Sequence, residues 1–151
     1  MKLNLEINNQ SKSPITQAFF ATAWKMAFAD KALVFPSSKN FNLSLALVSR
    51  AEIKRINRIW RKKNEVTDVL SFAEFKSLKT IRASREKEVF LGEIILCYDD
   101  IKVYAKKNGL KIKAELAKVF LHGILHLLGW KHGSKMFALQ NKFLTKLKWN
   151  D

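Results

Sequence analysis

The sequence VFLHGILHLLGWKH, residues 119–132, decides the fold. Between residues 119 and 128 every side chain is apolar except those of His122, Gly123 and His126. A helix with this composition is apolar on nearly all sides and has to be buried. The stretch is also too short to span a bilayer. It therefore predicts a central helix in the core of a folded domain.

The segments on either side of this helix alternate between strand and helix periodicity. Leu3, Leu5 and Ile7 alternate with polar residues, which is typical of a half-buried strand. Within residues 50–63 the apolar side chains recur at helical spacing and are expected to face inward; they are Ile53, Ile56 and Trp60. The pattern predicts strands at residues 2–8, 41–48, 69–72 and 89–98, a loop at 76–88, and helices at 14–29, 50–63, 99–108, 111–129 and 134–148. We expect an α/β (α+β) fold, in which residues 1–151 form one compact domain with a small mixed β-sheet of about four strands and about five helices.

The charge balance indicates an anionic partner. The chain has 28 Lys and Arg against 13 Asp and Glu, a formal charge of +15. RNA, DNA and acidic membrane surfaces all attract such a protein by phosphate neutralisation and counterion release. The apolar share of 48% is ordinary for a folded domain and excludes a disordered chain.

Cysteine use and the N-terminal pattern bear on location. Cys97 is the only cysteine, so a disulfide within the chain and a cysteine-based zinc knuckle are both excluded. It lies in an apolar strand pattern and is expected to be a small core residue. The first residues, MKLNLEINNQ, lack the apolar run of a signal peptide. We expect a cytoplasmic protein without a membrane span.

The three histidines of the chain all lie within residues 122–132. His122 and His126 are four residues apart, so on a helix their rings project from the same face. Gly129 can adopt a positive φ that ends the helix and brings His132 back to the same point. Three imidazoles with an open fourth position are typical of a catalytic zinc site, although imidazole ligands alone do not separate zinc from nickel. The alternative is a set of core histidines satisfied by hydrogen bonds.

The spacing of these histidines is also that of metzincin proteases, which carry a glutamate after the first histidine as general base. Gly123 occupies that position here. A zinc peptidase is therefore disfavoured. The glycine is expected to remove bulk and negative charge beside the metal, so that a phosphate can approach.

Basic residues gather in the helix predicted at residues 50–63. Lys54, Arg58 and Arg61 follow each other at i, i+4 and i+7 and form one basic side. An arginine at its end can bind a phosphate with two parallel hydrogen bonds. Asp68 and Ser71 follow in a strand-like segment, where capping and site roles are equally open, whereas Glu115 is expected to be solvated. The residues predicted to attract RNA by charge are Arg50, Lys54, Arg55, Arg58, Lys62 and Lys63.

Two motifs resemble those of the YbeY endoribonuclease family. The first is INRIWR, residues 56–61, followed by TDVLSF, residues 67–72; the second is LGEI, residues 91–94, followed after a helix by the three-histidine segment. The resemblance covers roughly residues 40–145. It implies one zinc ion bound by His122, His126 and His132, with Arg61 close to the metal and important for activity.

The function implied by this resemblance is cleavage of single-stranded RNA in ribosomal RNA maturation, at the 3′ end of the small-subunit rRNA, and in ribosome quality control. Its partners are then ribosomal RNA and the small ribosomal subunit, with neither DNA nor a membrane expected. Two departures from the family keep an alternative open: Lys131 replaces the aspartate that usually precedes the third histidine, and the segment before the last helix is short. The alternative is a ribosome-associated RNA-binding factor whose zinc is structural.

Overall fold

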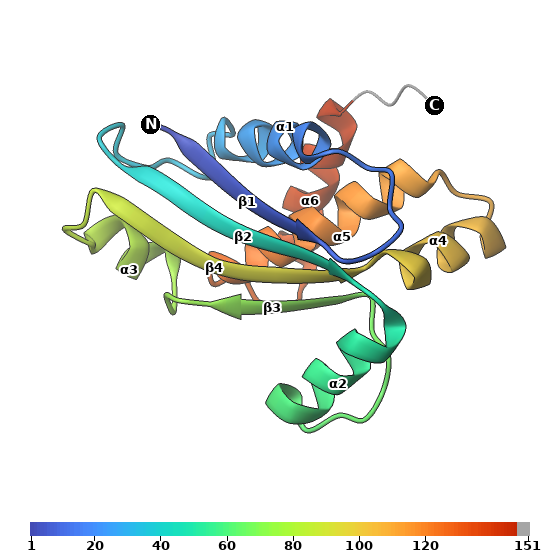
Figure 1. Cartoon of the computed structure of the whole chain (residues 1–151). Coiled ribbons are helices and arrows are strands. Elements are labelled where there is room, and N and C mark those ends of the chain that lie inside the picture. The colour runs from blue at the N-terminus through green and yellow to red at the C-terminus, as the bar shows by residue number, and fades with distance from the viewer. Residues whose placement is uncertain (148–151) are drawn as a thin grey trace.

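A four-stranded mixed sheet forms the centre of the protein in a computed structural model, which describes residues 1–147. The strand order is β1-β2-β4-β3; β1, β2 and β4 are parallel, and β3 runs antiparallel to β4 (Figure 1). The strands are β1 (Leu3–Asn9), β2 (Asn40–Val48), β3 (Val69–Ala73) and β4 (Glu88–Cys97). The helices are α1 (Gln17–Phe28), α2 (Arg50–Arg61), α3 (Leu78–Ala83), α4 (Tyr98–Lys107), α5 (Ile112–Leu127) and α6 (Ser134–Lys146). The prediction of one α/β domain with four strands is confirmed.

The two faces of the sheet are covered unequally. Side chains of α1, α5 and α6 pack on one face around the fully buried Trp24 and Phe120. On the other face, Ile53 of α2 packs against Ile95 of β4 in a much smaller cluster. Figure 1 shows α2 set apart from the other helices, on the far side of β3. The candidate site lies in a cleft lined by residues of α2, β3 and α5.

One predicted loop and one predicted helix start are wrong for identifiable reasons. The segment at 76–88, expected to be a loop, contains α3, because Ser77 and Thr80 form a reciprocal capping box and Ile81 is fully buried. This makes six helices instead of about five. The first helix begins at Gln17 and not at 14, because Ser13 is held in a turn where Asn9 donates to its carbonyl oxygen. The predicted end of the last helix at Lys148 lies outside the described residues.

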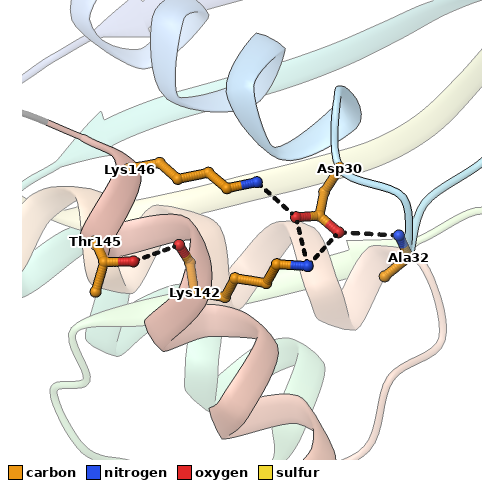
Figure 2. A network of polar contacts seen from close by, with 5 residues as sticks. All are labelled: Asp30, Ala32, Lys142, Thr145 and Lys146. Atoms are coloured by element: carbon orange, nitrogen blue, oxygen red, sulfur yellow. Dashed lines mark hydrogen bonds and ion pairs between the residues drawn. The ribbon is translucent and has the colours of Figure 1, made fainter.

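The last helix is tied to the first by a buried carboxylate. Asp30, just after α1, has no exposed side-chain surface and accepts hydrogen bonds from the backbone N–H of Ala32 and from the ammonium groups of Lys142 and Lys146 (Figure 2). The hydrogen bond from Ala32, followed by that from Lys146, holds the pKa of Asp30 far below its usual range. The network fixes α6, whose other half reaches the candidate site.

The single cysteine lies where the sequence predicted it. Cys97 is buried and unpaired in β4, and burial raises the pKa of its thiol, as expected for a core residue. None of the helices formed by residues 1–147 is both long and apolar enough to cross a membrane.

Candidate metal centre

The rings of His122, His126 and His132 converge on one point at the end of α5. The three Nε2 atoms are 3.0 Å apart for His122 and His132, 3.0 Å for His122 and His126, and 3.1 Å for His126 and His132. Two nitrogen ligands of one tetrahedral zinc ion, each about 2.0–2.1 Å from it, lie roughly 3.3–3.4 Å apart, only a few tenths of an ångström more than the distances here. These three residues could therefore hold a metal ion.

Hydrogen bonds at the opposite ring nitrogens show which atoms are available to a metal. Nδ1 of His126 is 2.9 Å from the carbonyl oxygen of Trp130, and Nδ1 of His122 is 2.9 Å from Oε1 of Gln140. Both partners are acceptors, so each Nδ1 carries the proton and each Nε2 presents a lone pair. Lone pairs 3.0 Å apart repel each other unless a cation lies between them. The chemistry of the donor set thus fits a metal ion better than a hydrogen-bonded core cluster.

The local sequence explains how the chain reaches this geometry. The helix ends in a Schellman motif, in which the N–H of Trp130 donates to the carbonyl of Leu125 and the N–H of Gly129 donates to that of His126. Gly129 has a φ of 89°, which confirms the prediction of a positive φ at this residue. A Cβ here would lie 2.7 Å from Cα of Ser77, so side chains are excluded by contact as well. The turn brings His132 to the other two rings.

The environment favours the neutral form of two of the imidazoles. Burial lowers the pKa of His122 below its ordinary value. The pKa of His126 is also lowered, first by burial and then by the neighbouring His122. A metal binds the neutral form of histidine, so a low pKa reduces competition from protons. Both shifts favour metal binding at neutral pH.

Gln140 is a site residue that sequence reasoning missed. It lies on α6, is 2% exposed, and accepts a hydrogen bond from Nδ1 of His122. Met136 and Phe143 on the same helix are core residues. A polar side chain at a core position of an amphipathic helix was the available signal, because a buried amide requires a partner.

Arg61 lies at the C-terminal end of α2, and its position is fixed by two contacts. Its guanidinium donates to the carbonyl oxygen of Ser71 at 2.5 Å and lies 5.0 Å from the centre of the Phe72 ring. Its positive charge is one of the weaker factors that lower the pKa of His126, after burial and His122. The predicted partner of the histidines is thus brought to them from a distant part of the sequence.

A cleft of about 520 Å³ joins Arg61 to the three histidines. Asp68 and Thr67 line it, as does the amide-bearing Asn57. Asn57 is buried and donates to the carbonyl of Glu65, which holds the loop after α2 in place. The negative charge of Asp68 raises the pKa of His122, although less than burial lowers it. Asp68 therefore lies at the site. The sequence had left open whether it has a role there or only in capping.

The other predicted RNA-binding residues divide into two groups. Arg50 forms an ion pair with Asp100 at 3.7 Å, and Arg55 forms one with Glu52 at 2.5 Å, so their charges are partly neutralised. The remaining four are exposed and form no ion pair within residues 1–147; they are Lys54, Arg58, Lys62 and Lys63. Of these four, Lys63 also lines the cleft.

Two expectations about neighbouring residues are wrong. Gly123 does not open space beside the histidines: a Cβ at this residue would meet Ile94 of β4 at 3.1 Å, so the glycine allows α5 to pack closely on the sheet. Glu115 is 8% exposed, not solvated, and lies 3.9 Å from Lys118. Lys131 is exposed and takes no part in orienting the rings.

A family model described as endoribonuclease YbeY matches residues 6–148 of the chain. The chain belongs to the YbeY family. Among similar YbeY endoribonucleases, that of Staphylococcus carnosus is 43% identical over 69% of this chain and 74% of its own length. That of Sulfurihydrogenibium sp. is 34% identical over 78% of each chain. That of Myxococcus xanthus is 37% identical over 82% of this chain, which matches 41% of that longer protein.

The YbeY fold also resembles a solved structure. The solution structure of TM1509 from Thermotoga maritima superposes with a TM-score of 0.58, covering 94% of this chain and 87% of the other at 24% identity. The likeness supports the fold assignment.

Proposed function

We propose that this YbeY family member is a zinc-dependent endoribonuclease that cleaves single-stranded RNA. The observation that carries the proposal is the convergence of the Nε2 atoms of three histidines beside Arg61 in a cleft of a strongly basic protein. The family name of the relatives supports the same activity.

His122, His126 and His132 would hold the zinc ion, because three neutral imidazoles with an open position are typical of catalytic zinc. When bound there, zinc supplies a Lewis acid and lowers the pKa of water. Arg61 binds a phosphate oxygen and stabilises the negative charge that develops during cleavage. The carbonyl of Ser71 and the ring of Phe72 keep its guanidinium directed for this role.

The size of the cleft supports a preference for a single strand. At about 520 Å³ it has the size of a small-molecule pocket and admits a short segment of strand. An unpaired strand can turn its bases out into such a space, whereas a duplex cannot without melting. We further propose ribosomal RNA, including the 3′ end of the small-subunit rRNA, as substrate, the small ribosomal subunit as partner, and a cytoplasmic location.

The proposal is tested by incubating purified zinc-loaded protein with an end-labelled RNA of mixed sequence, its duplex and the matching DNA. We expect cleavage of the single-stranded RNA alone, and loss of cleavage when a chelator removes the metal. RNA that is bound and left intact, together with a lower melting temperature after chelation, would show instead an RNA-binding factor with a structural zinc. Hydrolysis of a peptide and not of RNA would point to a peptidase.

Ribosome association requires a separate experiment. Sedimentation of the protein with purified small and large ribosomal subunits is expected to show binding to the small subunit that weakens as salt is raised. Equal binding to both subunits would indicate charge attraction without a specific partner.

A further inference from the structure

Trp60 has the most exposed large apolar side chain of residues 1–147, at 70%. By contrast, Trp24 is fully buried. Exposure of an indole is unfavourable in water, and Trp at a surface is enriched where a ligand covers it. The helical spacing of residues 50–63 predicted that Trp60 faces inward with Ile53. That prediction is wrong, because the indole lies on the surface of α2.

A second cavity, of about 630 Å³, is lined both by Trp60 and by two of the histidines, His126 and His132. Phe72 and Ala73 also line it. Arg61 lines both this cavity and the first cleft, as do the same two histidines. The two spaces thus meet at the group proposed to bind phosphate.

The aromatic side of the second cavity is held by packing. The ring of Phe72 contacts Trp60 edge to face, with centroids 6.4 Å apart and an angle of 70° between the planes. Phe72 is in turn covered by the guanidinium of Arg61. Trp60 lies on α2, which Ile53 anchors to the sheet. The indole is therefore presented on a regular element and not on a loop.

We propose that the second cavity is a nucleobase subsite, in which the indole of Trp60 stacks on the base of the nucleotide next to the phosphate bound by Arg61. This inference rests on the proposed function, since it requires a nucleic acid strand at the histidines. The occupant is an unpaired base because every base has a flat face that stacks on an aromatic ring, while the linked phosphates match Arg61 at this cavity and Lys63 at the first cleft. The first cleft then receives the nucleotide on the other side of that phosphate.

Trp60 acts here as a binding residue. Its replacement is expected to weaken the binding of the strand while leaving the rate at saturating RNA close to that of the original protein. The effect is also expected to depend on the base and not on the phosphates, which separates stacking from the charge attraction of the neighbouring lysines.

The test measures equilibrium binding of zinc-loaded protein to two strands of equal length, an adenosine homopolymer and a chain of abasic nucleotides, with the strands checked for integrity. Both strands carry the same phosphates. We expect Trp60→Ala to bind the adenosine strand at least about 5-fold more weakly, the lower end of one base-aromatic stack, and to bind the abasic strand unchanged. Trp60→Phe is expected to retain most of the affinity, and Trp60→Leu to resemble Trp60→Ala.

Tyr104→Ala is the matched control, because Tyr104 is 51% exposed on α4 and lines neither cavity. It should bind both strands normally. Equal losses for both strands in Trp60→Ala, or no loss for either, overturns the subsite. Cleavage by the original protein with no effect of Trp60→Ala refutes the subsite alone; base-dependent binding without cleavage refutes the proposed enzymatic function alone.

Discussion

Two polar clusters, both including residues of α6, differ in whether groups of the protein alone satisfy them. At the C-terminal end of the helix, the carboxylate of Asp30 is matched by Lys142 and Lys146. Farther toward its N-terminus, Gln140 fixes the ring of His122 so that its lone pair faces that of His126. The first cluster is complete within the protein and stabilises the fold, whereas the second is complete only with a cation. An unmatched set of lone pairs therefore marks the functional end of the molecule.

Among the changes that leave the three histidines and their metal in place, the largest effect on activity is expected from Arg61. Arg61→Ala removes a donor directed at the phosphate and is expected to lower RNA cleavage by about 10²- to 10³-fold, as measured by initial rates on a labelled single strand. Arg61→Lys keeps the charge but not the paired donors and should recover only part of this loss. Cleavage unchanged in both variants would mean that the contacts to Ser71 and Phe72 are structural only.

A smaller effect is expected from the support of the histidines. Gln140→Leu removes the acceptor for Nδ1 of His122 and should weaken zinc binding by roughly 10- to 100-fold, measured by competition with a chelator. Gln140→Glu keeps an acceptor and is the control that should bind zinc at least as well as Gln140→Leu. Lys142→Met, on the same helix but in the other cluster, should leave zinc affinity unchanged.

The Asp30 cluster should affect stability and not chemistry. Asp30→Asn is expected to lower the free energy of unfolding by about 1–2 kcal/mol, since the lysines are half-exposed and screened by solvent, while cleavage at saturating zinc stays unchanged. Because the pKa of Asp30 is lowered in the folded state, its stabilisation is full above the unfolded pKa of about 4 and is lost as the pH falls below it.

Denaturant titrations of both proteins between neutral and acidic pH measure this difference. The gap between them should narrow as the medium becomes acidic. A gap that stays constant down to low pH would mean that the carboxylate charge of Asp30 does not contribute.

The smallest effect distinguishes the basic residues of α2. Arg58→Ala should reduce the salt dependence of RNA binding by about one counterion, whereas Arg55→Ala should reduce it less, because Arg55 is already paired with Glu52. Binding measured over a series of salt concentrations gives both slopes. Equal slopes in the two variants would show that the ion pair opens when RNA binds.

The histidine cluster could be predicted from sequence because it depends on neighbours in the chain. The four-residue spacing places the rings of His122 and His126 on one side of α5, and the turn at Gly129 brings the ring of His132 back to them. All of these residues lie within a short stretch of the chain. Periodicity likewise predicted the four strands. The strand order and the antiparallel direction of β3 depend on long-range pairing, which no local pattern specified.

The parts that the sequence did not reveal are those assembled across the fold. Gln140 comes from α6 and Trp60 from α2, and each acquires its role from the packing of its helix. α3 was missed because its short capping box lies in a polar segment, with Ile81 as the buried anchor. The i, i+3 spacing of Glu52 and Arg55 allows the ion pair that forms between them. The prediction that Arg55 attracts RNA rested on the net charge of the helix and left this pair out.

Metal content is the most direct test of the claim that the three lone pairs share a cation. Elemental analysis of the protein purified with zinc and dialysed should give about one zinc per chain, and His126→Ala should give almost none while retaining the circular dichroism of the folded protein. Equal zinc content in the two proteins, or a folded original protein without zinc, would contradict the account.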